Sequence, residues 1–177
     1  MLSISPERVY RGNDAWDKAL PQIAKLSQNP LILGRSLNTQ NLRNKIFKDL
    51  ENQNLNVSYA NLKFDCCYED ISRVKSIILE NNNDSVIAAG GGKVLDSGKY
   101  IAESLNIPCI TLPLSASTCA GWSALTNIYT KNGQFIKDVA LGSCPKILVY
   151  DHKFIQTAPP RTLASGIADA LAKWYES

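Results

Sequence analysis

The chain has 177 residues, enough for one ordinary domain or slightly more, and 45% of them are hydrophobic. Its net charge of +3 comes from 19 basic and 16 acidic residues that are interleaved along the sequence, which argues against nucleic acid or a membrane surface as a partner. No apolar run is long enough to span a membrane and the start of the chain lacks a signal-peptide pattern, so we expect a cytoplasmic protein.

Short apolar runs alternate with amphipathic segments over most of the chain. The predicted strands are an edge strand at residues 8–10, then residues 30–34, 57–62, 86–89 and 107–113. The predicted helices are residues 20–26, 39–53, 68–81 and 94–105. Pro21 is expected in the first turn of the first helix, where its missing N–H does no harm. This alternation indicates an α/β protein whose parallel strands are joined by helical crossovers and covered on both faces.

The pattern changes after Thr118. Asn132 and Gly133 stand between two apolar runs, residues 124–129 and 135–141, and this arrangement predicts a β-hairpin. Residues 147–150 are predicted to return to the sheet as a strand.

Two consecutive prolines at positions 159 and 160 suggest a domain boundary, because proline breaks any helix that approaches it. We therefore expect an α/β domain at residues 1–158 and a second segment at residues 159–177. The second segment is Ala-rich and helical and has no C-cap signal, as expected for the first helix of a truncated domain.

Cysteine and histidine content limits the chemistry of the chain. Its five cysteines include no Cys-x-x-Cys pair, and we expect reduced thiols, several of them buried as small hydrophobic groups. The single histidine, His152, follows a predicted strand and is interpreted as a surface or helix-start residue. One histidine cannot build a His-rich metal site.

A glycine turn, Gly90-Gly91-Gly92-Lys93, joins the strand at residues 86–89 to a helix. The free N–H groups and the dipole of a helix N-terminus favour an anion, glycines let a ligand approach the backbone, and Lys93 adds a positive charge. These features favour the pyrophosphate of a nucleotide. The spacing matches neither G-x-G-x-x-G nor G-x-x-x-x-G-K-[ST], so a tight strand-to-helix connection is the alternative.

The next strand also ends in small residues, Ser115, Ser117 and Thr118 among them. Ligands of open parallel sheets bind outside the carboxyl ends of strands. Two neighbouring strand ends are thus suited to close approach by a ligand.

Three segments carry a family resemblance: G-G-G-K-V-L-D-S-G-K, P-L-S-A-S-T-C-A-G-W-S-A-L-T-N-I-Y and A-P-P-R-T-L-A-S-G-I-A-D-A-L-A-K-W-Y-E. In this order they resemble the glycerol dehydrogenase branch of the iron-containing (group III) alcohol dehydrogenases. The resemblance implies a Rossmann-like sheet followed by an all-helical domain, as in the dehydroquinate synthase-like fold. It also implies NAD or NADP as cofactor, a divalent zinc or iron ion, a small alcohol or polyol as substrate, and a homo-oligomer.

The cofactor residues that the resemblance implies are Arg35, Gly91, Gly92, Lys93, Asp96, Leu114, Ser117, Ser123, Leu125 and Tyr129. An acid such as Asp96 repels a diphosphate, and capping of the helix is its plainer interpretation. Ser117, Ser123 and Tyr129 would provide hydroxyl groups, with turn and sheet packing as the alternative. Leu114 replaces the usual threonine of the family, so one hydroxyl contact is missing.

Two further residues stand at functional positions of the family. Cys119 replaces the aspartate that engages the polyol, and because a thiol is a poor acceptor, glycerol itself is in doubt as substrate. Asp169 matches a metal ligand that acts with two downstream histidines, whereas an ion pair with Lys173 at i+4 is the alternative. With this single ligand, we expect the chain alone neither to bind metal tightly nor to show dehydrogenase activity.

Arg35 stands where the family has an aspartate after the strand at residues 30–34. An acid there selects NAD through the adenosine ribose, whereas an arginine accommodates the extra phosphate of NADP. A guanidinium grips phosphate with two parallel hydrogen bonds, so we expect a preference for NADP; a solvated loop residue is the alternative.

Two other functions stay open on the sequence. A glycerol-1-phosphate dehydrogenase or a 3-dehydroquinate synthase-like enzyme would require additional basic residues for a substrate phosphate. A catalytically silent nucleotide-binding module is the other alternative, since the downstream histidines are absent from the sequence.

Overall fold

The computed structural model describes residues 5–176, except for the side chains of Lys173 and Glu176. Its elements, in chain order, are β1 (Arg8–Gly12), α1 (Ala15–Leu26), β2 (Pro30–Gly34), the 3₁₀ turn η1 (Leu37–Thr39), α2 (Gln40–Glu51), β3 (Ser58–Asn61), α3 (Tyr68–Glu80), β4 (Ser85–Gly90), α4 (Gly92–Ser104), β5 (Cys109–Pro113), β6 (Leu125–Tyr129), β7 (Phe135–Ala140), β8 (Ile147–Asp151), α5 (His152–Ile155) and α6 (Pro160–Glu176). The predicted alternation of strands and helices is confirmed. His152 starts α5 and is exposed, as predicted.

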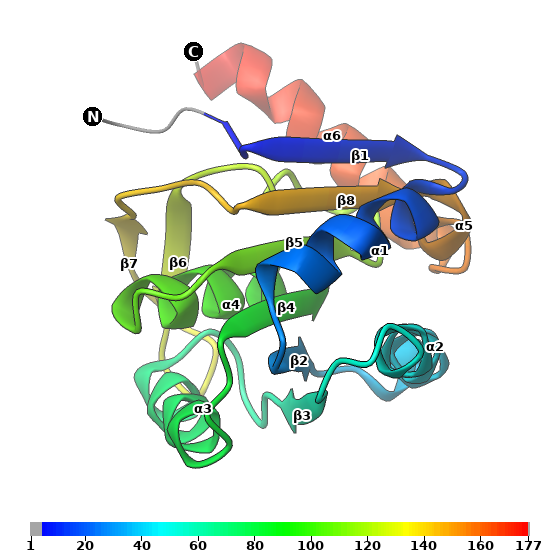
Figure 1. Cartoon of the computed structure of the whole chain (residues 1–177). Helices are drawn as coiled ribbons and strands as arrows, with labels where there is room; N and C mark the ends of the chain where they lie inside the picture. The colour runs from blue at the N-terminus through cyan, green and yellow to red at the C-terminus, as the bar shows by residue number, and fades with distance from the viewer. Residues whose placement is uncertain (1–4, 177) are drawn as a thin grey trace.

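Six strands form one parallel sheet in the order β1-β8-β5-β4-β2-β3 (Figure 1). Every neighbouring pair in it runs parallel. The connection after β2 leads to the edge of the sheet at β3, and the chain then crosses back over β2 to β4. Strands β2 and β4 therefore form the point at which the strand order reverses, where open α/β sheets bind their ligands.

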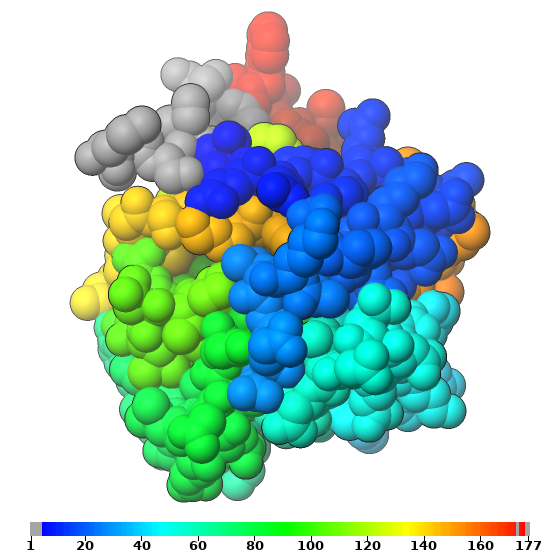
Figure 2. Space-filling view, viewed as in Figure 1, coloured from blue at the N-terminus to red at the C-terminus, as the bar shows by residue number. Residues whose placement is uncertain are grey.

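Both faces of the sheet are covered, as predicted, because side chains alternate along each strand. Ile87 and Ala89 of β4 pack into one core with α1 and α2, whereas Val86 and Ala88 pack into the other core with α3 and α4. The space-filling view shows α1 and α2 side by side on the first face (Figure 2). Helices α2 and α4, which follow the adjacent strands β2 and β4, thus lie on opposite faces.

Helix α1 begins earlier than the sequence predicted. It starts at Ala15 rather than at residue 20, so Pro21 lies inside the helix and its predicted place in the first turn is wrong. The reason is tertiary: Trp16 is 1% exposed and its backbone N–H donates to Oδ2 of Asp151, 2.9 Å away and 135 residues later in the chain. Asp151 also accepts from the backbone N–H of Lys153 at 2.9 Å and so caps α5.

The predicted hairpin is present as the antiparallel pair β6 and β7, which packs beside α4. Gly133 forms the turn with φ +81°. The backbone N–H of Tyr129 donates to the carbonyl of Cys66 at 2.8 Å, which fixes the hairpin to the loop that follows β3.

Helix α6 begins at Pro160, within the segment at residues 159–177 that was predicted to be helical. At Gly166 it approaches the loop after β5 so closely that an added Cβ would overlap the carbonyl oxygen of Ala116. Another side of α6 is apolar but exposed, through Leu163, Ile167 and Leu171. The domain boundary proposed from the sequence stays a prediction.

All five cysteines are free thiols; four are buried and Cys119 is exposed, which agrees with the prediction of reduced thiols. Within residues 5–176, no helix has the length and apolar character needed to cross a membrane.

We predict that Gly166→Ala destabilises the protein although alanine favours helix by about 1 kcal/mol over glycine. The methyl group has no room against Ala116, and such overpacking costs roughly 1 to 3 kcal/mol. Thermal unfolding checks this, with Ser165→Ala on the exposed side of α6 as the matched control. A melting temperature raised equally by both substitutions would contradict the close approach of α6 to the loop.

Candidate functional site

A cavity of about 440 Å³ lies at the carboxyl edge of the sheet, where the strand order reverses. Its lining residues are Arg35, Ser36, Asn38 and Thr39 after β2, residues 90–94 around the glycine turn, Leu114 and Ser115 after β5, and Thr157, Ala158, Pro159, Arg161 and Thr162 around the start of α6. The two strand ends that the sequence singled out therefore meet in one cavity.

Three helix N-termini border this cavity. They belong to the η1–α2 segment, to α4 with Gly91 as its N-cap, and to α6. No side chain caps the N-terminus of α4, so the first N–H groups of this helix are left for a ligand. The lining residues include three cationic side chains, Arg35, Lys93 and Arg161, and no acid. The electrostatic character of the cavity suits an anion with several negative charges.

Asp65, in the loop after β3, restrains two of these cations. Its Oδ1 lies 3.0 Å from Nη2 of Arg35, and its Oδ2 accepts a hydrogen bond from Nζ of Lys93. Asp65 is 7% exposed, and the contact of Oδ1 with Arg35 is an ion pair without hydrogen-bond geometry. Lys93 also lies over the ring of Tyr129, 5.0 Å from its centre. The positions of both cations thus depend on an acid that the sequence analysis missed.

The sequence-predicted cofactor residues fall into two groups. Arg35, Gly91, Gly92, Lys93 and Leu114 line the cavity. The others lie outside its lining. Among these, the Ser117 hydroxyl is 3.1 Å from the hydroxyl of Ser115, which lines the cavity, and Tyr129 contacts Lys93.

Asp96 does not cap the helix, so that interpretation is wrong. It is inside α4, 6% exposed, and pairs with Lys99 at 3.0 Å. Lys99 in turn donates to the carbonyl oxygens of Ser123, at 3.1 Å, and Leu125. Burial raises the pKa of Asp96, and the charge of Lys99 partly opposes that shift. This buried pair fixes the loop that carries Ser123 and Leu125.

Asp169 is partly buried on α6, and the side chain of Lys173, its predicted ion-pair partner, lies outside the described residues. Within residues 5–176, no group of three or more His, Cys, Asp or Glu side chains gathers as a metal site would require. The donor set of these residues does not fit a complete zinc or iron site. Asp169 could supply a single carboxylate ligand, which is fewer than a zinc or iron site requires.

Cys119 is exposed in the loop between β5 and β6. Burial raises the pKa of the neighbouring Tyr150, and proximity to Cys119 raises it further. The thiol is therefore accessible at the position that the resemblance assigns to the substrate.

Several lining residues were missed by sequence reasoning, among them Asn38, Thr39, Thr157, Arg161 and Thr162. Asn38 and Thr39 follow the end of β2, whereas Thr157 follows α5 and Arg161 and Thr162 lie in the first turn of α6. Arg161 stands in the segment that was assigned wholly to the second domain.

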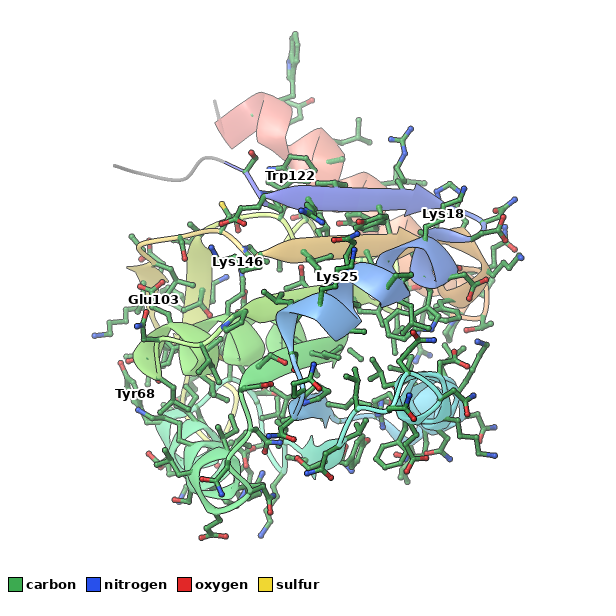
Figure 3. The ribbon with its side chains drawn as sticks, viewed as in Figure 1. Lys18, Lys25, Tyr68, Glu103, Trp122 and Lys146 are labelled. Atoms are coloured by element: carbon green, nitrogen blue, oxygen red, sulfur yellow. The ribbon has the colours of Figure 1, made fainter. Side chains whose placement is uncertain are left out.

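A second cavity of about 420 Å³ lies near the start of β5 and β8, lined in part by Glu103 and Lys146 (Figure 3). Glu103 accepts from the backbone N–H of Gly142 at 2.7 Å, and Lys146 pairs with Glu7. Because both side chains already have partners within the protein, we assign no ligand to this cavity.

The sequence pattern of the iron-containing alcohol dehydrogenases matches residues 6–152. The chain is 37% identical over 177 residues to an uncharacterized oxidoreductase from Synechocystis sp., an alignment that covers 99% of this chain and 45% of that protein. It is 31% identical over 173 residues to a glycerol dehydrogenase from Escherichia coli, covering 98% of this chain and 47% of that protein. The chain therefore spans about half the length of the curated relatives it matches.

The fold is also similar to the crystal structure of glycerol dehydrogenase from Schizosaccharomyces pombe. The TM-score is 0.84 at 30% identity, over 98% of this chain and 44% of that one. The predicted fold and family resemblance are confirmed by these matches.

We predict that iodoacetamide modifies one thiol of the native protein quickly, that of Cys119. Burial raises the pKa of Cys66 to about 11 and that of Cys109 to about 12, so both stay protonated and unreactive at about pH 8. Mass spectrometry of the alkylated protein checks this, and Cys119→Ser should remove the fast site. Fast labelling of a second cysteine would contradict the burial of the other four.

Proposed function

The chain belongs to the iron-containing alcohol dehydrogenase family, and we propose that it carries the nucleotide-binding part of a dehydrogenase that acts on a small alcohol or polyol. The proposed cofactor is NAD or NADP, bound in the cavity at the carboxyl edge of the sheet. One observation carries this proposal: three helix N-termini and three cations border a cavity whose lining includes no acid.

In this proposal, different residues of the cavity have different roles in binding the nucleotide. The backbone at Gly91 and Gly92 receives the pyrophosphate, and Lys93 offsets part of its charge. Asp65 keeps Lys93 at the cavity wall, and the Asp96–Lys99 pair fixes the loop that carries Ser123 and Leu125. When bound, the nicotinamide supplies the hydride acceptor. The chain's own residues bind and orient it.

Residues 159–176 are proposed as the first helix of a helical domain. The exposed apolar side of α6, with Leu163, Ile167 and Leu171, supports this proposal, because such a side is normally covered by another helix. Asp169 is proposed as one metal ligand of that domain. Since the described residues contain no group of three or more metal-ligating side chains, no catalytic step of this proposal passes through a metal.

A catalytically silent nucleotide-binding module is the second candidate. The observation that favours it is the absence of a cluster of metal-ligating side chains among residues 5–176. Both candidates require nucleotide binding. They differ in whether the protein oxidises an alcohol once the nucleotide is bound.

Isothermal titration calorimetry with NADP⁺ and NAD⁺ tests the proposed function directly. We expect saturable binding that weakens about tenfold or more in Lys93→Gln, because a charge-assisted contact to phosphate is lost. Lys18→Gln, on the solvent side of α1, is the matched control (Figure 3). No binding of either nucleotide would refute the proposal.

We predict a preference for NADP⁺ over NAD⁺, with Arg35 at the rim of the cavity. Arg35→Gln should reduce the ratio of the two dissociation constants about tenfold, since the guanidinium no longer meets the extra phosphate. Arg11→Gln, on the edge strand β1, is the matched control. Equal dissociation constants in the unmodified protein would show that Arg35 does not select the cofactor.

We predict that the chain alone binds zinc only weakly, with a dissociation constant above about one micromolar, because structural zinc sites need four ligands. Competition with a chromophoric chelator measures the constant. Asp169→Asn should leave it unchanged. Tight binding that this substitution abolishes would show that the described residues do assemble a metal site.

A further inference from the structure

Arg43 on α2 is a buried arginine that the function proposed above does not use. It is 1% exposed and one of the largest fully buried side chains of the protein. Its guanidinium packs against Gly34 at the carboxyl end of β2, where an added Cβ would collide with it. The glycine that ends β2 is therefore the residue that makes room for this cation.

The partners of Arg43 are all neutral. Nη2 donates to the carbonyl oxygen of Ser36 at 2.8 Å and to Oε1 of Gln40 at 2.9 Å. Nη1 donates to the hydroxyl of Thr39 and Nε to that of Tyr59, whose ring centre lies 5.7 Å from the guanidinium carbon.

No carboxylate of the described residues forms an ion pair with Arg43, in contrast to Arg35, Lys93 and Lys99. Buried charges in proteins are normally paired with a charge of opposite sign, because their removal from water is costly. Neutral acceptors such as these do not require a charged donor. The uncompensated charge of Arg43 is therefore unexplained by packing or hydrogen bonding alone.

The position of Arg43 supplies an explanation. Ser36 and Thr39, which accept its hydrogen bonds, both line the cavity, so the guanidinium lies directly behind the cavity wall. Arg35, on the same rim, is already paired with Asp65. Arg43, behind this rim, carries a positive charge that no carboxylate of the described residues pairs with.

We propose that Arg43 contributes to cofactor specificity together with Arg35: its missing counter-charge is the 2′-phosphate of NADP, bound at the rim formed by Arg35, Ser36 and Thr39. Arg43 acts from behind the wall. It holds the turn that faces the phosphate through its bonds to Ser36 and Thr39, and it adds a charge that few solvent molecules can screen. This inference rests on the proposed binding of a nicotinamide nucleotide in the cavity.

The test measures dissociation constants of NADP⁺ and NAD⁺ for the unmodified protein, Arg43→Gln and Arg43→Lys by calorimetry. In Arg43→Gln, we expect NADP⁺ to bind about tenfold more weakly while NAD⁺ changes less than about twofold, because one charge is removed and only NADP⁺ meets it. Arg43→Lys keeps the charge and should keep the preference. If Arg43 has a purely structural role, the binding of both nucleotides will weaken equally in both variants. That result would overturn the proposal.

A second measurement uses no substitution, so it does not depend on whether a variant folds. In the unmodified protein, the Nε–H resonance of Arg43 should shift on addition of NADP⁺ and stay in place on addition of NAD⁺ at saturation. Identical shifts with the two nucleotides, or none, would overturn the proposal. Equal affinity for NADP⁺ and NAD⁺ in the unmodified protein would also overturn it while leaving nucleotide binding intact, whereas failure to bind either nucleotide would refute the proposed function itself.

Discussion

The parallel pairing of β2 with β4 is the constraint on which the rest of the structure depends. Because the helices that follow these neighbouring strands lie on opposite faces of the sheet, the chain leaves an opening between their carboxyl ends. The N-terminus of α4, which no side chain caps, borders that opening. A cavity suited to an anion is therefore a consequence of topology, and the glycine turn and the cations suit it to the proposed ligand with several phosphates.

Acidic residues outside the cavity keep its positive side chains in place. Asp65 holds Arg35 and Lys93 from behind, and Asp96 holds Lys99, which fixes the adjoining loop through two carbonyl oxygens. The Asp96–Lys99 pair is buried and adds little net stability, because the cost of desolvation offsets the attraction between the charges. The effect of both acids is to define where the cations and the loop lie.

Local sequence patterns were enough to predict most of the fold. The elements that were predicted wrongly depend on long-range contacts. Strand β2 and the hairpin turn at Gly133 were predicted because apolar runs and turn residues are local signals. The start of α1 was missed since the bond that fixes Trp16 comes from Asp151. At the site, the family resemblance implied five of the lining residues, whereas the roles of Asp65 and Arg43 depend on partners that no spacing in the sequence reveals.

The central claim is that the cavity between β2 and β4 binds a nicotinamide nucleotide through its pyrophosphate. A crystal structure of the protein with NADP⁺ is the most direct test. The account predicts phosphate oxygens within hydrogen-bonding distance of the backbone N–H groups at Gly92 and Lys93, with the adenosine end toward Arg35. A nucleotide found instead in the cavity beside Glu103 and Lys146, or with its phosphates away from the start of α4, would contradict it.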